Sequence, residues 1–345
     1  MSIKQLAQEL GLSISTVSRA LNGYTDVSAA TRSRVMRHAD MLGYQPHPGA
    51  RSMKSGKSNT IGIILPLDEH GQFINALYSR LLGGIASFLD ERGYTLMVTT
   101  NFSHQVRDEV QRYEQLIRSR LVDGVVVVRT LLNDPRVDML SQMQTPFVTY
   151  GRCHEPNRHH WVDTDNERAF ELATQRQIEQ GHRRIALLNG PAAYTFAWLR
   201  QQGYENALRA ANILPEPALI QNGDLTESSG YSLTRDLLTM RNKPTALICA
   251  NDAMAIGAIA ACRERGLRVG NDISIMGYGN SDASRYCDPP LSTIEHRAYE
   301  NGRHIGVLLL AQLEGTQESG GMHHYLESVE LVPRLSDGPV SPTCN

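Results

Sequence analysis

The sequence of 345 residues is poor in aromatic residues and in cysteine, and it contains no long apolar run. Aromatic residues make up 6% of the chain, and its five cysteines are scattered without a C-x-x-C spacing. Cysteines in this arrangement favour free thiols in a reducing compartment over a disulfide framework or a zinc site. No apolar segment approaches the roughly 20 residues of a membrane-spanning helix, and the polar start MSIKQLAQEL is unlike a signal peptide. We therefore expect a soluble protein of the cytoplasm.

The sequence also lacks the motifs that mark common catalytic and cofactor sites. It has no G-x-G-x-x-G after a strand, no Walker sequence, no G-x-S-x-G and no H-E-x-x-H. The adjacent pairs His159-His160 and His323-His324 are more typical of loops than of a metal site. We expect no catalytic residues, no metal site and no cofactor.

The net charge is only −2, but the charged residues are unevenly distributed. The first 60 residues hold eight basic side chains against three acidic ones, which leaves 26 basic and 33 acidic side chains for the rest. A head of net charge +5 is therefore followed by a body of net charge −7. A polyanion would be attracted to the head and repelled by the body. At roughly 100–200 residues per domain, the length predicts two or three domains.

The pattern of the first 45 residues predicts three short helices. Apolar residues recur at helical spacing from Ile3 to Leu10, and Gly11 follows as a stop. Ser13 can cap a second helix, and Ser28 can cap a third that ends at Gly43. Two short helices joined by a tight turn with Gly are typical of the helix-turn-helix, whose second helix enters the major groove of DNA.

Four side chains of this second helix are left off its buried face, and their chemistry suits DNA. They are an apolar group, two hydroxyls and a guanidinium, which can contact thymine methyls, base edges and phosphates. These residues are Ile14, Ser15, Ser18 and Arg19. The alternative is a three-helix bundle whose charges are merely solvated. For Val17 we favour packing inside the motif.

Residues 46–58 are predicted to form a linker. Pro46 and Pro48 begin it, a short helix can form around Met53, and a Ser/Gly/Lys-rich stretch ends it. The alternative is a disordered spacer, which is what we expect of the unbound protein.

From Thr60 onward, apolar strand-like runs alternate with helical stretches. The expected strands are IGIILP, TLMVTT, GVVVV, FVTY, IALLNG, ALICAND and ISIMGY, and the expected helices span 74–92, 105–119, 198–211 and 253–265. Runs of Val, Ile and Leu that alternate with helices are typical of parallel strands covered on both faces. Two such series in tandem predict two α/β lobes with a ligand crevice at the carboxyl ends of the strands.

Four motifs resemble those of the lactose-repressor/galactose-repressor (LacI/GalR) family of bacterial transcription regulators. They are TVSRALN, DVSxxTRxRV, ANDxMAIGA and PPLSTI, and the resemblance runs in register from about Ile3 to Pro333. It implies an all-α helix-turn-helix head followed by an α/β two-lobed sensor domain of the periplasmic-binding-protein type, with Rossmann-like parallel sheets. It also implies crossovers between the lobes near 150–165 and 292–294.

The resemblance implies a set of DNA-contacting residues in the head and the hinge. Ile14 and Ser15 match the pair that discriminates between operators, and Met53 matches a leucine that wedges into the minor groove. In the family this hinge becomes helical only on DNA. The full set of expected DNA contacts is Ser13, Ile14, Ser15, Thr16, Ser18, Arg19, Asn22, Thr31, Arg51 and Met53.

A second set of residues is expected to bind a small-molecule effector. Some follow predicted strands, others match effector-contacting family positions, and the aromatic ones could stack on a sugar. The set is Asp68, Phe73, Arg129, Arg152, Phe196, Trp198, Arg200, Asn251, Asp252, Asn280 and Asp282. The arginines could instead bridge the lobes or be solvated, and Asp252 could instead cap a helix. Many family members carry Asp where this chain has Gly279.

Taken together, these features predict a dimeric, cytoplasmic repressor that binds a pseudo-palindromic operator and responds to a small sugar. The expected parts are a helix-turn-helix domain at 1–45, a hinge at 46–58, a two-lobed effector-binding and dimerisation domain at 59–333 and a polar tail at 334–345. The stretches DGVVVVRTLLNDPRV and PFVTYGRCHE are similar to members that control α-glucoside or α-galactoside use. A purine or nucleoside effector, corepression in place of induction, a solute receptor without DNA binding, and an enzyme on this scaffold are the alternatives.

Overall fold

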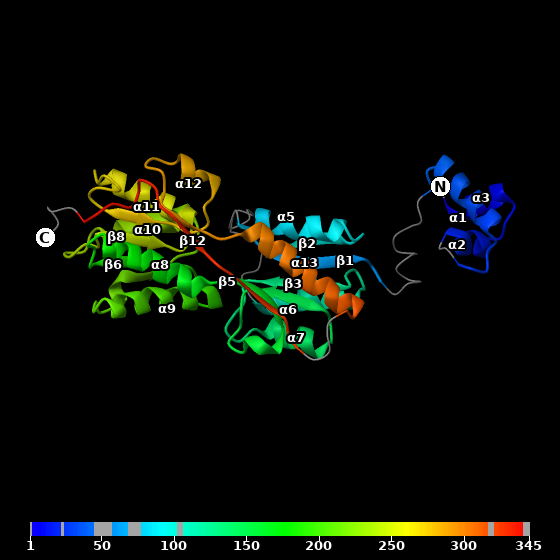
Figure 1. Ribbon diagram of the computed structural model, residues 1–345, viewed down its shortest axis with the longest axis horizontal. Coiled ribbons are helices and arrows are strands. Elements are labelled where there is room, and N and C mark those ends of the chain that lie inside the picture. The colour runs from blue at the N-terminus through cyan, green and yellow to red at the C-terminus, as the bar shows by residue number, and fades with distance from the viewer. Residues whose placement is uncertain are drawn as a thin grey trace. The chain divides into compact units, whose positions relative to one another are not determined.

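The computed structural model describes residues 2–21, 24–44, 57–67, 77–101, 106–316 and 321–340. The chain divides into two compact units, Met1–Ser58 and Asn59–Asn345. Figure 1 shows the helices of the first unit and the two α/β lobes of the second. Among the described residues, no helix is long and apolar enough to cross a membrane.

The small unit consists of three helices around a small apolar core. The helices are α1 (Ile3–Leu10), α2 (Ile14–Leu21) and α3 (Ala29–Met41). Ser2 caps α1 in a reciprocal capping box with Gln5, and the Ser13 Oγ accepts the Thr16 N–H at 3.0 Å at the start of α2. The buried core residues are Leu6, Ala7, Leu10, Val17, Ala20, Val27, Val35 and Ala39. The three predicted helices and the burial of Val17 are confirmed.

The first lobe of the large unit is a six-stranded parallel sheet in the order β11-β5-β4-β3-β1-β2. Its strands are β1 (Thr60–Pro66), β2 (Thr95–Asn101), β3 (Gly124–Val128), β4 (Phe147–Tyr150), β5 (His160–Thr164) and β11 (His324–Glu327). Alternate strand residues enter two separate cores: Ile61 and Val126 face one, and Ile64 and Val125 face the other. The helices α5 (Leu77–Asp90) and α13 (Ala298–Glu314) cover the first face, and α6 (Val106–Arg118) and α7 (Pro135–Gln142) cover the second.

The second lobe repeats this arrangement with a four-stranded parallel sheet in the order β7-β6-β8-β9. Its strands are β6 (Ile185–Asn189), β7 (Ile220–Asn222), β8 (Ala246–Cys249) and β9 (Ser274–Met276). Its long helices are α8 (Asn166–Glu179), α9 (Thr195–Ala210), α10 (Glu227–Leu237) and α11 (Asp252–Glu264), and α12 (Asp282–Tyr286) is short. Figure 1 shows α10 and α11 on one side of this sheet and α9 on the other.

Neighbouring helices in both lobes approach closely at glycines. A β-carbon on Gly84 of α5 would overlap the carbonyl oxygen of Tyr299 on α13. A β-carbon on Gly203 of α9 would overlap the carbonyl oxygen of Glu167 on α8 in the same way. Only glycine allows the two backbones to come this near.

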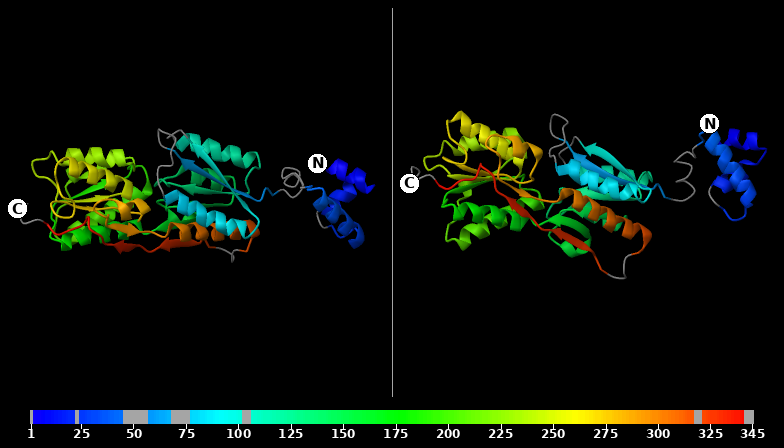
Figure 2. Two further views of the ribbon diagram at one scale, coloured as in Figure 1. Left: turned by 90° about the horizontal axis from the view of Figure 1, so that it is seen from above. Right: turned by 45° about the horizontal axis from the view of Figure 1, so that its top comes forward.

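Three connections join the two lobes, one more than the resemblance implies (Figure 2). The chain passes into the second lobe between β5 and α8, and it returns between β10 (Thr293–Glu295) and α13. The third connection runs from β11 to β12 (Glu330–Val332), which pairs antiparallel with β10. The third passage is absent from the prediction because β11 and β12 are too short to stand out as apolar runs.

Candidate functional site

A cavity of about 620 Å³, partly open to solvent, lies between the two lobes. Its walls include residues at or just after the carboxyl ends of parallel strands, such as Arg129 after β3, Tyr150 in β4 and Thr164 in β5. The edge of a parallel sheet where strands end is where α/β proteins of this kind bind ligands. The lining residues are Leu77, Tyr78, Arg129, Thr130, Tyr150, Gly151, Asp163, Thr164, Asn166, Phe196, Arg200, Leu225 and Tyr278.

The side chain of Arg200, from α9, lies buried in the wall of this cavity. Its Nε donates to the Asn166 Oδ1 and its Nη1 donates to the Ala250 carbonyl, both at 2.8 Å. The rings of Phe196 and Tyr278 lie 4.7 and 4.2 Å from its guanidinium carbon. Among the described residues no carboxylate lies within ion-pair distance of Arg200, and burial lowers its pKa below the usual value. A buried guanidinium that contacts carbonyl oxygens and aromatic rings, but no carboxylate, has a positive charge that a polar ligand can still neutralise or bind.

Asp163, the carboxylate in the cavity wall, already has hydrogen-bond partners in both lobes. Its Oδ2 accepts from the Arg152 Nε at 2.8 Å, and its Oδ1 accepts from the Thr164 N–H at 2.8 Å and from Asn166 at 3.2 Å. Burial raises the pKa of Asp163, and the neighbouring Arg152 opposes this shift. Arg152 itself does not line the cavity and lies over the Trp161 ring.

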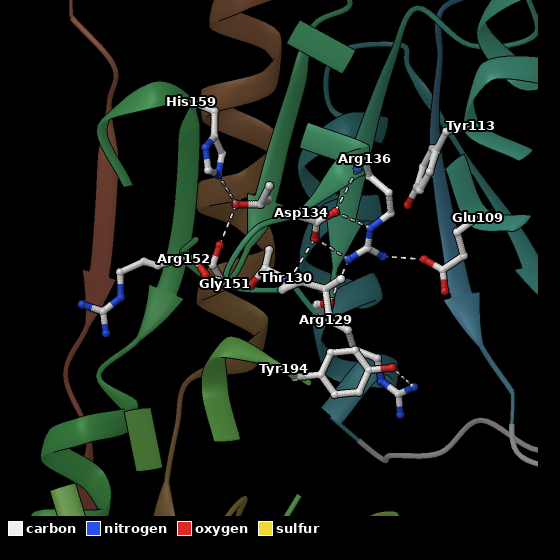
Figure 3. Close-up of polar contacts among 12 residues, drawn as sticks. Glu109, Tyr113, Arg129, Thr130, Asp134, Arg136, Gly151, Arg152, His159 and Tyr194 are labelled. Carbon is white, nitrogen blue, oxygen red and sulfur yellow. Dashed lines mark hydrogen bonds and ion pairs between the residues drawn. The ribbon is translucent and has the colours of Figure 1, made fainter. Parts of the chain in front are cut away.

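Arg129 lies at the edge of the cavity in an unusual backbone conformation. Its φ of 55° is in the left-handed region, which a residue with a side chain seldom occupies. The Arg129 Nη1 lies 3.5 Å from the Tyr194 hydroxyl of the second lobe, and Figure 3 shows its guanidinium against that ring. The side chain of Arg129 therefore reaches from the first lobe toward the second.

A buried ion cluster lies behind Arg129. Arg136 donates to both carboxylate oxygens of Asp134, at 2.9 and 2.7 Å, and also pairs with Glu109. It also donates from Nη2 to the Arg129 carbonyl at 2.8 Å. Figure 3 shows Arg136 between the two carboxylates. A two-pronged arginine–carboxylate pair fixes geometry as well as charge, so this cluster determines where the backbone of Arg129 lies.

The other predicted effector residues are spread more widely. Phe196 lines the cavity, whereas Trp198, one turn of helix away from Tyr194, lies outside the lining with 45% of its surface exposed. The Asn251 side chain caps α11 by accepting the Met254 N–H. Asp252 is buried and accepts from the Ser281 N–H and the Thr293 hydroxyl, both at 2.6 Å. Asp252 is therefore not the cap of α11, which was the alternative role considered for it, because Asn251 makes this cap.

The remaining predicted effector residues lie near α12 or outside the described residues. Asn280 is buried and bonds Glu295 and Arg334, and Asp282 is an exposed residue of the first turn of α12. Gly279 has a φ of 127°, a conformation that favours glycine. Asp68 and Phe73 lie outside the described residues. Among the described residues, no group of three His, Cys, Asp or Glu side chains is placed to hold a metal ion.

In the small unit, α2 presents polar side chains on its outer face. Ile14 is 47% exposed, Ser15 is exposed, and Thr16 and Ser18 are half-buried. Arg19 is exposed, pairs with Asp26 and lies over the Tyr24 ring. Ser13 and Thr31 take part in the hydroxyl caps that begin α2 and α3. Asn22, Arg51 and Met53 lie outside the described residues.

Sequence reasoning missed several residues of the cavity wall. They are Tyr78, Tyr150, Thr164, Asn166 and Tyr278. Tyr150 and Thr164 end their strands, so the rule that selected Arg129 could have found them. Tyr78 and Asn166 lie at the beginnings of helices, where the sequence pattern does not show which cavity they face.

Comparisons with known proteins agree with this architecture. Residues 2–47 match the family model described as bacterial regulatory proteins, lacI family, and residues 174–336 match a periplasmic binding protein-like domain. The HTH-type transcriptional repressor CytR of Escherichia coli (strain K12) is 34% identical over 337 residues, which cover 97% of this chain and 96% of CytR.

Two solved structures match this chain over both of its units. The lac repressor dimer bound to operator and the anti-inducer ONPF superposes with a TM-score of 0.85 at 28% identity, covering 97% of this chain and 98% of that one. The complex of the transcriptional regulator CelR with cellobiose has a TM-score of 0.75 at 30% identity, covering 97% and 99%.

A helix-turn-helix unit joined to a two-lobed binding unit defines a DNA-binding transcriptional regulator. This chain belongs to the LacI family of bacterial regulatory proteins, and it is a DNA-binding transcriptional repressor, not an enzyme. The family resemblance and the fold class predicted from the sequence are confirmed.

Proposed function

We propose that this repressor controls a carbohydrate-utilisation operon and that a small sugar, an α-glucoside or α-galactoside, binds between its lobes and alters its affinity for the operator. The observation that carries this proposal is the cavity itself. Its wall combines the buried guanidinium of Arg200 with the amide of Asn166 and with the rings of Phe196 and Tyr278. Forked polar groups that bind hydroxyls, beside rings that pack on an apolar sugar face, form the usual chemistry of carbohydrate recognition. The cellobiose complex of the similar CelR supports a sugar ligand.

On the DNA side, we propose that α2 reads the operator in the major groove. Ile14 and Ser15 lie exposed at its start, where recognition helices contact base edges. Arg19 can contact a phosphate or a base edge once it leaves its exposed pair with Asp26. The protein would act in the cytoplasm, on the nucleoid when bound to the operator, and as a dimer, because one such motif makes too few contacts for specific affinity.

Control of operator binding by an effector requires that the effector bind one arrangement of the lobes better than another. Only this differential affinity can shift the balance between the operator-binding and released states. A ligand that bound both arrangements equally would leave operator affinity unchanged.

A nucleoside effector is the second candidate, and the aromatic rings favour it. Tyr78, Tyr150, Phe196 and Tyr278 all line the cavity, and a planar base can stack on such rings. Sugar and base would use the same guanidinium, so the two candidates differ in which part of the ligand the rings contact.

A thermal-shift screen of the full-length protein separates these candidates. A ligand at one hundred times its dissociation constant stabilises the folded protein by about 2.7 kcal/mol. We expect a rise in melting temperature with α-glucosides or α-galactosides, and a gel-shift titration with the same sugar should change operator binding. A shift with nucleosides alone would favour the second candidate, and an operator complex that no sugar or nucleoside alters would contradict the switch.

A further inference from the structure

A short segment of the first lobe bonds directly to the second lobe across the cleft. The Thr195 N–H, at the start of α9, donates to the Thr130 carbonyl at 2.9 Å. Leu131 and Tyr194 form an isolated antiparallel bridge at the same place. The segment 129–131, called here the interlobe arm, follows β3, and it lines the cavity through Arg129 and Thr130.

The interlobe arm is held rigidly from the side of its own lobe. The Arg129 carbonyl accepts from Arg136 at 2.8 Å, and the Leu131 N–H donates to the Asp134 Oδ2 at 3.0 Å (Figure 3). The Thr130 Oγ1 donates to the Arg152 carbonyl at 3.0 Å. Each residue of the arm thus has its own anchor in the first lobe, and these anchors offset the cost of the left-handed backbone at Arg129.

The partner group in the second lobe is a helix N–H with no acceptor inside its own helix. Tyr194 is the N-cap of α9 and Thr195 is the first helical residue, so the Thr195 N–H belongs to the unsatisfied first turn. Thr195 is also buried, with 3% of its surface exposed. A buried N–H needs a partner, and within the described residues the partner is the carbonyl of the other lobe.

We propose that the interlobe arm is a preset latch that sets the balance between closed and open lobes, and that Arg136 is the positioning residue that holds it ready. When the lobes part, the Thr195 N–H loses its acceptor while the arm keeps its conformation. Because the arm is already ordered in the open form, closure requires little further loss of conformational entropy. The fraction of closed protein scales the apparent affinity of a ligand that binds only the closed form. This consequence rests on the proposed function, whereas the latch itself can be tested in the free protein.

Hydrogen exchange at a single amide reports the latch without any ligand. The Thr195 N–H should exchange slowly in the full-length protein. The matched reference is the N–H of Glu227, the first residue of α10, for which the described structure gives no acceptor and which is exposed. We expect the Thr195 amide to exchange at least about tenfold more slowly than the Glu227 amide. Equal exchange rates at the Thr195 and Glu227 amides would overturn the proposal that the interlobe arm is a latch.

Proline substitution then removes the latch bond while keeping the helix. Proline is well tolerated at the first helical position, and Tyr194 has the extended backbone that a following proline requires (ψ 140°). Thr195→Pro deletes the donor to the first lobe, and Glu227→Pro is the control at the equivalent position of α10. Thr195→Ala keeps the N–H and controls for the side chain.

Small-angle scattering of the full-length variants should show a larger radius of gyration for Thr195→Pro than for the wild type, with both controls unchanged. Loss of one hydrogen bond should weaken binding of any sugar found in the thermal-shift screen by about three- to tenfold. A Thr195→Pro protein with wild-type dimensions contradicts the latch whether or not a sugar is found. If the wild type binds no sugar but its Thr195 amide is still protected, the proposed effector is wrong and the latch is not contradicted.

The role of Arg136 is read at the same amide. Arg136→Gln should speed exchange at Thr195 by about tenfold, and Arg136→Lys should partly restore protection. If loss of this buried charge prevents folding, Thr130→Val removes a milder anchor and should also speed exchange at Thr195. Folded variants that leave the Thr195 rate unchanged would show that the anchors do not position the arm.

Discussion

The two units of the molecule differ in where they keep their charged and polar side chains. In the described part of the small unit, every buried residue is apolar, and Arg19 and Asp26 pair at the surface. The large unit instead buries Asp134, Arg136 and Asp163 and satisfies them with ion pairs and hydrogen bonds.

This difference reflects what each unit has to do. A DNA-reading surface needs charges that can exchange an intramolecular contact for a phosphate at little cost, and exposed pairs are worth about 1 kcal/mol or less. A ligand-binding cleft needs groups held in one position, and buried charges are held because separating them costs several kcal/mol. If this contrast holds, changes to the buried groups of the large unit should lower the free energy of unfolding more than changes at the surface of the small unit.

The largest effect is expected from breaking the buried ion cluster in the large unit. Arg136→Met leaves Asp134 buried without its cation and should lower the free energy of unfolding by about 3–5 kcal/mol. Urea denaturation of the full-length protein, followed separately for each unit, measures this change. The small unit should unfold at the same urea concentration as before.

The matched control for this variant removes the buried charge of the partner as well. Asn can still cap α7 as Asp134 does, so Asp134→Asn combined with Arg136→Met should be more stable than Arg136→Met alone. A double variant as unstable as the sum of the two single variants would show that the two charges do not act together.

A smaller effect is expected at Gly279, where the family resemblance implies an aspartate in many members. The φ of 127° at Gly279 is strained for any residue with a side chain, so Gly279→Asp should lower the free energy of unfolding by about 1–3 kcal/mol. Gly279→Ala should cause a similar loss, since the cause is the backbone and not the charge. A stable Gly279→Asp protein that binds a sugar more tightly would show that the backbone adapts and restores a ligand contact.

Acid should destabilise the large unit before the small one. Burial lowers the pKa of His159 to about 4 and that of His296 to about 3, against about 6.5 in an unfolded chain. Between pH 6.5 and pH 4 the unfolded state binds more protons, so the free energy of unfolding falls as the pH falls, by up to about 1.4 kcal/mol per pH unit for each histidine. Denaturation of His296→Gln should show a shallower pH dependence than denaturation of the wild type.

Much of the large unit could be predicted from local pattern alone. The apolar runs GVVVV and IALLN are β3 and β6, and the helix expected over 105–119 is α6. Several of the elements without prediction have a locally polar sequence. β5 reads HWVDT, yet all five residues are buried, because its polar side chains have hydrogen-bond partners outside the strand, namely His323 for His160, Arg152 for Asp163 and Asn301 for Thr164. The helix α10 (ESSGYSLTRDL) contains three serines and one glycine, and it packs closely on α11 at Gly230 and at Gly257 of the facing helix.

The candidate site was less accessible to sequence reasoning than the fold. The position of Arg129 after a strand could be predicted, Arg200 came from the family resemblance, and Phe196 came from the expectation that an aromatic ring stacks on a sugar. That Asp163 is paired with Arg152, and that Asp252 holds Ser281 and Thr293, depends on contacts between residues that are 11, 29 and 41 positions apart in the chain. Local sequence shows which residues are polar, but not which of them remain available to a ligand.

The smallest effect on stability, and a large effect on function, is expected from Arg19→Ala in the small unit. Arg19 is exposed and its pair with Asp26 is also exposed, so the free energy of unfolding should change by no more than about 0.5 kcal/mol. Operator binding should weaken by about 1–3 kcal/mol, and if Arg19 contacts a phosphate the slope of log affinity against log salt should fall by about one. Arg37→Ala, which removes the same charge from α3, is the control and should alter operator affinity less. Equal losses from both variants would mean that the head attracts DNA through its net charge and that α2 has no special part in reading it.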